Sequence, residues 1–436
     1  MNRLFDFIKK FRTPGLRVGT VVLALTLLVF AGAIDVNADT FVVDSTLDAV
    51  DDNPGDTFCD DGSGSCTLRA AVMESNALAG VDEIILSDET YVLTIFGGDD
   101  EAANGDLDIR DHLIIRGTGA ESTIIDSNGT RAFHLVDGDD LSQIEAEIYD
   151  MTLMNSLAGN AGGAIRNVAE ILTVDGLSLR DNSAPRGAGI YIGPEGEAEI
   201  SNSAIHNNTA TGDPGNERGG GIYNSGALTL VNVTISNNDA GDLGGGIFNE
   251  SVISAVFVTI AENVSPIGGG IHQTIGTDAD FFGSIIAGNT SDDCAGVFID
   301  SLGFNVSTSD CNLTDPTDMP DTDPLVGPLQ DNGGETLTHA LLDGSPAIDL
   351  ADNDFACFGI AVDQRGVVRP VDGDGDSDAV CDSGAFEFEL LVDSGDGSGG
   401  CSIAGNGSAS EPLPLYLLAP VFILILRFIR KRQTVS

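Results

Sequence analysis

Short runs in which apolar and polar residues alternate fill most of the chain between residues 83 and 311. The segment 228–235, Leu-Thr-Leu-Val-Asn-Val-Thr-Ile, is typical of these runs. A period of two residues is the pattern of a half-buried β-strand, and no helical period of useful length separates the runs. We therefore predict an almost entirely β structure for this part of the chain.

Two short phrases repeat through this region at nearly constant spacing. The first is a cluster of small residues, mostly glycine, that ends in isoleucine, with steps of 25, 32, 25 and 24 residues between successive isoleucines. The second is an alternating strand that ends in asparagine, with steps of 26, 30, 25 and 26 residues. The isoleucines are Ile165, Ile190, Ile222, Ile247 and Ile271, and the asparagines are Asn182, Asn208, Asn238, Asn263 and Asn289. Because the spacings of the two phrases change in parallel, both phrases belong to one repeat unit.

A unit of this length cannot bury its apolar face alone, but stacked units can, because each strand then pairs in parallel with its counterpart in the next unit. Glycine permits the sharp turns with positive φ, and crossover chirality favours right-handed winding. The sequence therefore predicts a right-handed parallel β-helix over residues 83–311. We interpret the asparagines as a ladder at the turns, because asparagine tolerates the left-handed backbone conformation and its side chain can hydrogen-bond to the asparagines of the coils above and below. The alternative is that the asparagines form a row that binds a ligand.

Ring side chains follow four of the repeated isoleucines. They are Tyr191, Tyr223, Phe248 and His272. If the isoleucines point inward, alternation along each strand points these rings outward, so that they stack along one face. Such a row can bind the apolar faces of sugars, or it can serve only to stabilise the sheet by cross-strand stacking.

The N-terminus has the layout of an export signal. Five basic residues precede an apolar run over 18–34, and the small-residue pattern Val36-Asn37-Ala38 follows it. We predict a signal peptide over residues 1–38 that is cleaved after Ala38. An uncleaved membrane anchor is the alternative.

A second targeting segment is expected at the C-terminus. A linker over 390–410 contains Gly399-Gly400-Cys401, and the segment 411–436 holds an apolar stretch over 413–426 followed by a basic tail. By the positive-inside rule both basic ends stay in the cytoplasm, and the chain between them lies outside. This layout resembles the cleavable C-terminal sorting signals of Gram-negative bacteria, which implies processing near Cys401. A permanent anchor is the alternative.

The cysteines agree with an exported protein. Six of the seven fall into neighbouring pairs around loops, and oxidising compartments favour such disulfides. The expected pairs are Cys59–Cys66, Cys294–Cys311 and Cys357–Cys381. The seventh is Cys401, inside the sorting-like motif. Six cysteines allow 15 pairings, so pairing between neighbours is a prediction and no more.

The charge of the chain narrows its possible partners. Its formal net charge is −49. Between residues 39 and 410 there are 65 acidic residues, ten arginines and no lysine, which gives 10 − 65 = −55. Such a surface repels nucleic acid and anionic lipid, so a polyanionic ligand would need a bridging metal. Solubility alone is the other explanation for the acidity.

One acidic loop is a candidate calcium site. Alternate aspartates in a glycine-rich loop offer oxygen ligands at a spacing similar to that of an EF-hand, although the glutamate that closes such a loop is missing. The residues are Asp372, Asp374, Asp376 and Asp378. We expect either a structural Ca²⁺ or a solvated acidic turn.

Catalytic residues are not evident from the sequence. No nucleophile, metalloprotease or phosphate-binding motif occurs. If the protein is a lyase, the best available candidates for its base are Arg186 and Arg218, which precede glycine turns. The simpler interpretation is that both are surface arginines beside turns.

Several phrases outside the repeats resemble a known group of proteins. They are Asp39-Thr-Phe-Val-Val-Asp-Ser-Thr46, Cys66-Thr-Leu-Arg-Ala-Ala71, Asp323-Pro-Leu-Val-Gly-Pro-Leu-Gln-Asp-Asn-Gly-Gly334, Gly344-Ser-Pro-Ala-Ile-Asp349, Asp363-Gln-Arg-Gly366 and Cys381-Asp-Ser-Gly-Ala-Phe-Glu387. Together they resemble exported bacterial proteins with an N-terminal domain named for the motif Cys-Ser-Leu-Arg-Glu-Ala (CSLREA) and a C-terminal choice-of-anchor domain. Thr67 and Ala70 depart from that motif.

This resemblance implies a β-helix of the pectate-lyase-like superfamily that is exported and attached to the surface, with no established activity. We expect an N-terminal cap over 39–82 with a short helix near 66–77, in which Leu68 and Val72 share one face, and a choice-of-anchor-like region over 312–389.

The sequence thus predicts an exported, cell-surface β-helix, either a non-catalytic adhesion or glycan-binding scaffold or a polysaccharide lyase or glycoside hydrolase. A spacer without any ligand is a third possibility. Expected partners are an extracellular glycan or cell-surface component, the membrane before processing, and the export and sorting machinery.

Overall fold

The computed structural model describes residues 38–98, 101–138, 143–296, 299–351 and 357–390. These residues lie in one compact unit that extends to Leu390. Within the described ranges, no helix is both long and apolar enough to cross a membrane. Residues 1–37 of the expected signal peptide, Cys401 and the apolar stretch 413–426 fall outside the described residues.

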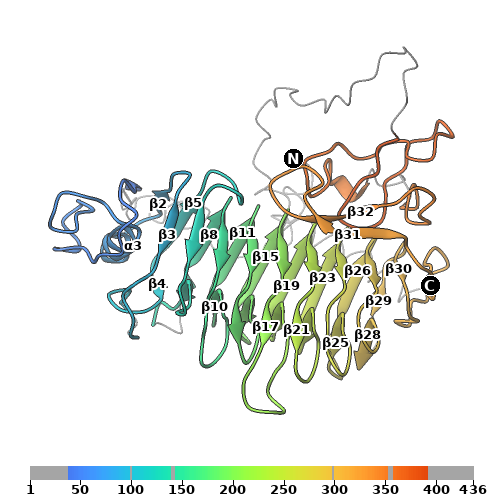
Figure 1. Cartoon of the computed structure of the whole chain (residues 1–436), viewed down its shortest axis with the longest axis horizontal. Coiled ribbons are helices and arrows are strands. Elements are labelled where there is room, and N and C mark those ends of the chain that lie inside the picture. Colours follow the sequence, from blue (N-terminus) through green and yellow to red (C-terminus); the bar gives the residue numbers. More distant parts are fainter. Residues whose placement is uncertain (1–37, 99–100, 139–142, 297–298, 352–356, 391–436) are drawn as a thin grey trace, which may run out of the picture. The chain divides into compact units, whose positions relative to one another are not determined.

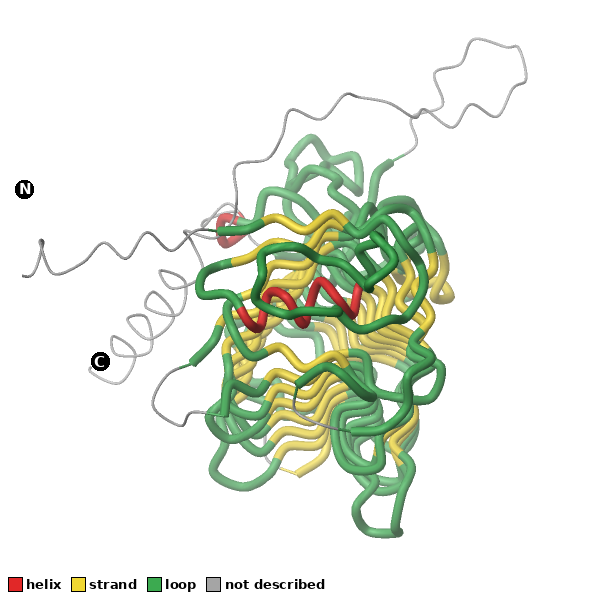
Figure 2. Tube along the Cα trace, turned by 90° about the vertical axis from the view of Figure 1, so that its left-hand side faces the viewer, coloured by secondary structure: helices red, strands yellow, loops and turns green. Residues whose placement is uncertain are grey.

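Three long parallel sheets form the walls of a β-helix, seen side on in Figure 1 and end on in Figure 2. The ten-stranded sheet holds, in order, β1 (Thr40–Val42), β2 (Asp82–Ile85), β5 (Leu113–Arg116), β8 (Glu145–Tyr149), β11 (Ile171–Asp175), β15 (Glu197–Ser201), β19 (Ala227–Val231), β23 (Val252–Val256), β26 (Ala279–Phe282) and β29 (Asp300–Ser301). The eight-stranded sheet holds β4 (Leu107–Ile109), β7 (Phe133–Leu135), β10 (Ile165–Asn167), β14 (Ile190–Ile192), β18 (Ile222–Asn224), β22 (Ile247–Asn249), β25 (Ile271–Gln273) and β28 (Cys294–Gly296). The nine-stranded sheet holds β3 (Thr90–Val92), β6 (Ile124–Asp126), β9 (Thr152–Met154), β12 (Ser178–Arg180), β16 (Ala204–His206), β20 (Thr234–Ser236), β24 (Thr259–Ala261), β27 (Ile285–Ala287) and β30 (Val306–Ser307).

Two small sheets complete the described strands. A parallel sheet contains β13 (Ser183–Ala184), β17 (Thr209–Ala210) and β21 (Asp239–Ala240), and an antiparallel pair contains β31 (Val326–Gln330) and β32 (Thr338–Leu341). The predicted parallel β-helix is therefore confirmed.

The repeated isoleucines form one inward column of the core. Ile165, Ile190, Ile222, Ile247 and Ile271 pair with one another in register across consecutive coils. Each is at most 1% exposed, and full burial of such a side chain stabilises the fold by about 1.5–3 kcal/mol. The first residue of each preceding glycine cluster has positive φ, as Gly219 does at 65°, so the predicted turns are present.

The asparagine ladder is present, but its backbone differs from our expectation. Asn208 and Asn238 are fully buried, and the side chain of Asn208 donates to that of Asn238 at 2.9 Å. The positive φ belongs instead to the residue before each ladder asparagine, as at Asn207 and Asn237, both with φ 55°. The left-handed residue makes the turn, while the ladder asparagine points inward and satisfies buried backbone groups.

The N-terminal segment caps the helix and also extends it. The only α-helix of the described ranges, α3 (Leu68–Ala77), lies across the first coils (Figure 2). It begins where the side chain of Thr67 accepts a hydrogen bond from the backbone N–H of Ala70. Within the predicted cap over 39–82, β1 pairs in parallel with β2 and so lengthens the ten-stranded sheet.

The C-terminal segment covers part of the nine-stranded sheet. Gln364 accepts a hydrogen bond from the hydroxyl of Thr234 on β20 at 2.7 Å, and His339 bonds to Ser236 at 2.8 Å. The backbone of Ala385 bonds to Thr259 on β24 at 3.0 Å. A 3₁₀ turn, η3 (Cys357–Gly359), lies within this segment.

The cysteine pairs are those expected from their order in the chain. Their Cα atoms are 5.0 Å apart in Cys59–Cys66, 5.1 Å in Cys294–Cys311 and 6.0 Å in Cys357–Cys381. Each pair ties a loop close to one end of the coils or within the C-terminal segment.

Candidate functional site

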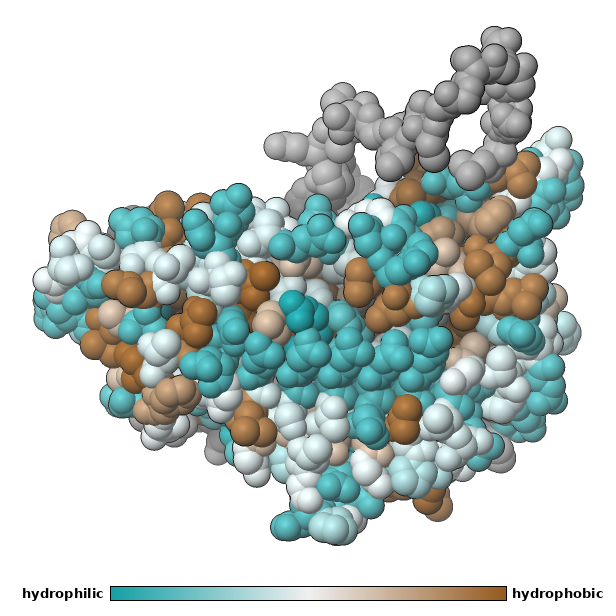
Figure 3. Space-filling model, viewed as in Figure 1, coloured by the Kyte–Doolittle hydropathy of each residue, from teal (hydrophilic) through white to brown (hydrophobic). Residues whose placement is uncertain are grey.

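The outer face of the eight-stranded sheet carries the best candidate site. The C-terminal segment covers part of the nine-stranded sheet. The ten-stranded sheet presents mainly carboxylates and hydroxyls at its outward positions, such as Glu147, Thr173 and Glu199. One side of the molecule is accordingly hydrophilic across its middle (Figure 3).

Seven side chains at one register position form what we call the outer column. It comprises Asp108, His134, Arg166, Tyr191, Tyr223, Phe248 and His272, from β4, β7, β10, β14, β18, β22 and β25. Each lies between two inward-facing residues of its strand, so that alternation directs it away from the core.

The rings of the outer column stack as the sequence predicted. Ring centroids are 5.3 Å apart for Tyr191 and Tyr223, 5.0 Å for Tyr223 and Phe248, and 5.4 Å for Phe248 and His272. The central rings are less open than a flat sugar platform requires, because Tyr223 is 5% exposed and Phe248 is 1% exposed. Tyr191 and His272 at the two ends are partly exposed.

Two arginines lie over the buried rings. The guanidinium carbon of Arg186 is 5.8 Å from the ring centre of Tyr223, and that of Arg218 is 5.1 Å from Phe248. The hydroxyl of Tyr223 donates to Glu250 at 2.5 Å. Burial, followed by this hydrogen bond, raises the pKa of Tyr223 well above its usual value, so the phenol stays protonated.

His272, at the end of the ring series opposite Tyr191, is neutral. Burial is the main cause that lowers the pKa of His272, and the positive charge of Arg218 lowers it further. The Nδ1 atom of His272 is buried and has no hydrogen-bond partner among the described residues.

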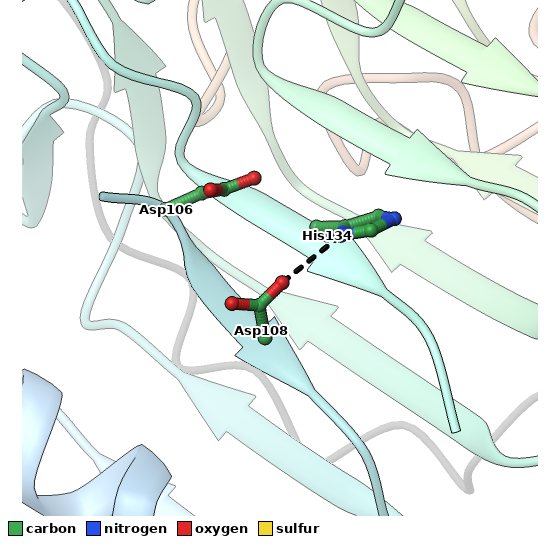
Figure 4. Close-up of side chains that lie close together, drawn as sticks. All are labelled: Asp106, Asp108 and His134. Atoms are coloured by element: carbon green, nitrogen blue, oxygen red, sulfur yellow. Dashed lines mark hydrogen bonds and ion pairs between the residues drawn. The ribbon is translucent and has the colours of Figure 1, made fainter. Parts of the chain in front are cut away.

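The other end of the outer column is a hydrogen-bonded chain of charged and polar groups. Nδ1 of His134 lies 2.9 Å from Asp108 Oδ1 (Figure 4), and Nε2 of His134 lies 3.1 Å from Nη1 of Arg166. Because arginine can only donate, Nε2 is assigned as the acceptor and Nδ1 carries the proton. Asp108 also accepts from the backbone N–H of Ala102 at 3.2 Å, and burial raises its pKa despite the bond from His134.

A second carboxylate, Asp106, lies beside this chain (Figure 4) and forms an ion pair with Arg131. Ligand atoms of Asp106, Asp108 and His134 lie within 4.8 Å of one another, the spread that a metal ion requires. Arg131 and Arg166 already supply two positive charges there, so these residues fit a closed hydrogen-bond network better than a cation site. A hollow of about 320 Å³ adjoins it, lined in part by Arg131 and Asn160.

The four aspartates of the predicted calcium loop do not converge as one set. Carboxylate oxygens of Asp372 and Asp374 come within 4.8 Å of one on Asp349, which the sequence analysis did not identify as a ligand. The backbone N–H of Asp378 instead donates to the carboxylate of Asp376 at 2.8 Å, and the backbone N–H of Asp376 donates to Asp374 at 2.9 Å. One oxygen of Asp349 accepts from the backbone of Gly373 and Asp374, at 3.0 and 2.7 Å, so the loop holds this carboxylate through amides.

Sequence reasoning missed the charged half of the outer column. Arg166 directly follows Ile165 in the repeated phrase, so the same position rule could have found it. Asp108 and His134 lie in coils without the glycine cluster, but each is a polar residue between two apolar ones, in Leu-Asp-Ile and Phe-His-Leu. Their shared register appears only once the coils are stacked.

Comparison of the chain with known proteins assigns no function to these residues. No protein-family description, no curated protein and no solved structure matches the chain.

Proposed function

We propose that this protein is an exported, surface-displayed β-helix that binds an extracellular glycan, without cleaving it, along the outer column. The observation that carries the proposal is the column itself: rings and polar groups continue in register across seven consecutive strands of one sheet.

Three features support a binding face of this kind. Partly exposed rings suit the apolar faces of sugars, and Tyr191 and His272 provide one such ring at each end of the ring series. Arg186 and Arg218, whose guanidinium groups can donate to hydroxyls, lie over the two buried rings between them. The rigid stack of coils orders these groups before any ligand binds, which lowers the entropic cost of association.

Export and attachment belong to the proposal as well. The predicted signal peptide, the disulfide pairs and the sorting-like segment around Cys401 all favour an oxidising location outside the cytoplasm. Fractionation of cells that express the full chain, with and without a Cys401→Ala change, tests this part. Retention of both forms in the cytoplasm would contradict it.

Binding is tested with the exported protein on an array of extracellular glycans. We expect Tyr191→Ala to lose most of the signal, because Tyr191 stacks on Tyr223 and is partly exposed. Phe58→Ala is the matched control, since Phe58 is 71% exposed but lies in the N-terminal segment. Equal binding by both variants at unchanged melting temperature would refute the assignment of this face.

One observation favours catalysis as the second candidate. In the Asp108–His134 pair the carboxylate orients the ring, and Nε2 of His134 would become a base if Arg166 moved away. A lyase or hydrolase acting on a glycan would then release unsaturated products or new reducing ends. Their appearance with the wild type and their absence with His134→Gln would establish this second function.

A further inference from the structure

Arginines on the outer face of the eight-stranded sheet are paired differently from most others in the chain. Six of the ten described arginines form ion pairs with carboxylates: Arg69, Arg116, Arg131, Arg180, Arg365 and Arg369. Among the described residues, Arg110, Arg166, Arg186 and Arg218 form no such pair. Three of these four, Arg166, Arg186 and Arg218, lie along the outer column.

The hydrogen-bond partners of these three arginines are neutral. Arg166 donates to His134, and Arg186 donates from Nε to the side-chain oxygen of Asn216 at 2.7 Å. Arg218 donates to the backbone oxygen of Gly215 at 3.3 Å. Three positive charges therefore remain uncompensated by a direct partner, in a chain whose central part carries a large excess of acid.

Donor groups on this face are also left unused. The Nε atoms of Arg166 and Arg218 are buried within the described structure and have no hydrogen-bond partner. A buried donor without a partner costs about 1–3 kcal/mol, so the protein by itself leaves both guanidinium groups incompletely hydrogen-bonded.

The nearby carboxylates are engaged elsewhere. Asp106 pairs with Arg131, Asp108 bonds to His134, and Glu250 accepts from the hydroxyl of Tyr223. None of the three forms an ion pair with the arginines along the column. The face therefore presents guanidinium groups that no described carboxylate pairs with, although the molecule as a whole, including Glu217 beside Arg218, is acidic.

The three arginines follow the coils one by one. Arg166 is on β10, Arg186 precedes β14 in the next coil, and Arg218 precedes β18 in the coil after that. Arg186 and Arg218 are direct bridge partners, so their backbones are about 4.8 Å apart along the axis. One positive charge per coil matches a linear polymer that carries about one anionic group per sugar.

We propose that the glycan bound by this face is anionic, carboxylated or sulfated, and that Arg166, Arg186 and Arg218 bind its anionic groups directly, without a bridging metal. This inference rests on the glycan-binding function proposed above and defines its ligand class. It also revises the expectation that a polyanion would need metal, which considered only the total charge. Guanidinium groups bind carboxylate and sulfate oxygens through two parallel hydrogen bonds, while the partly exposed ring of Tyr191 contacts the sugar.

Titration calorimetry in EDTA tests the proposal with oligosaccharides of equal length. The probes are an oligogalacturonate, a sulfated heparin-derived fragment and a neutral cello-oligosaccharide. We expect at least one anionic probe to bind and the neutral one to bind much more weakly, and we expect affinity to fall as salt is raised. The stronger of the two anionic probes identifies the anionic group.

Variants locate the contact. Arg186→Gln and Arg218→Gln should each weaken the affinity for the anionic probe about tenfold, the loss expected for one charged hydrogen-bond contact. Arg180→Gln removes the same charge from an exposed pair on the nine-stranded sheet and should leave affinity unchanged. Melting temperatures show whether each variant is folded.

Each other outcome has a distinct meaning. Tight binding of the neutral probe, unaffected by both arginine variants, would overturn this inference and leave the glycan-binding function intact. Anionic binding only after calcium is added would also overturn it, as would tighter binding of a single-stranded oligonucleotide. Absence of binding to all three oligosaccharides would remove both proposals.

Discussion

Removal of one rung of the asparagine ladder gives the most direct test of how the coils are held together. Asn238 is fully buried, and its side chain takes part in four hydrogen bonds. It donates to the backbone oxygen of Ile205 at 2.8 Å and to Asn263 at 2.9 Å. It accepts from the backbone and the side chain of Asn208, at 3.0 and 2.9 Å. In Asn238→Ala, the buried backbone N–H of Asn208 loses its partner.

The magnitude follows from these bonds. Each buried hydrogen bond contributes about 1 kcal/mol net, and a donor left unpaired adds about 1–3 kcal/mol. We therefore expect Asn238→Ala to lower the free energy of unfolding by about 3–5 kcal/mol. The chain has no Trp, so urea unfolding is best followed by far-ultraviolet circular dichroism. Asn53→Ala is the matched control, because Asn53 is exposed and, within the described structure, its side chain bonds only to Asp56, which is also exposed.

A small effect would refute this reasoning. If Asn238→Ala and Asn53→Ala unfolded at the same urea concentration with the same slope, the ladder would contribute nothing beyond backbone pairing. The stability of the stack would then have to come from the isoleucine columns alone.

Three further perturbations test other parts of the structure. Burial, with repulsion from Asp175 and Glu335, raises the pKa of Asp150 to about 6. Between about pH 4 and pH 6 the folded state therefore keeps a proton that the unfolded state releases, so the free energy of unfolding falls as the pH rises through this range. Asp150→Asn should therefore raise the melting temperature at pH 8 and leave it unchanged near pH 4. Glu387→Gln breaks a fully buried ion pair with Arg369 and should cost about 3–5 kcal/mol, measured as faster proteolysis of the C-terminal segment. If the loop binds calcium, the ion raises the melting temperature, and Asp374→Ala abolishes that rise.

Controls for these three experiments come from the same chain. Asp181 is exposed, forms an ion pair with Arg180 and has a φ of 57°, close to the 55° of Asp150. Asp181→Asn should therefore change the free energy of unfolding by less than about 1 kcal/mol. A pH-independent gain for Asp150→Asn would contradict the titration argument. Proteolysis of Glu387→Gln no faster than that of Asp181→Asn would show that the buried pair is dispensable. An equal calcium response in wild type and Asp374→Ala would remove the calcium prediction.

Much of the fold was predictable because its determinants are local and repeated. The isoleucines that end the glycine clusters recur at nearly constant spacing, and each faces inward for the same reason in every coil. The helix α3 was predicted from the spacing of Leu68 and Val72. The left-handed residues were misplaced by one position, since the sequence shows which residues tolerate positive φ but not which one the turn uses.

The candidate site was only half predictable. The ring series stood out because similar residues occupied equivalent positions in adjacent repeats. Asp108 and His134 differ in type, lie outside the glycine phrase and become neighbours only through the register of β4 and β7. Tyr223 and Phe248 are covered by the side chains of Arg186 and Arg218, which extend over them from neighbouring turns. The spacing of residues along the chain does not predict the direction in which these side chains extend.

The sequence by itself determined the parallel coils, the direction in which each strand faces and the acidity of the whole molecule, because period, alternation and charge are properties of order along the chain. Only the tertiary structure decided that three arginines without carboxylate partners gather on one face. Ion pairing depends on which groups come within about 4 Å of each other, and residues 20 to 32 positions apart, such as Arg166, Arg186 and Arg218, meet only when successive coils are stacked.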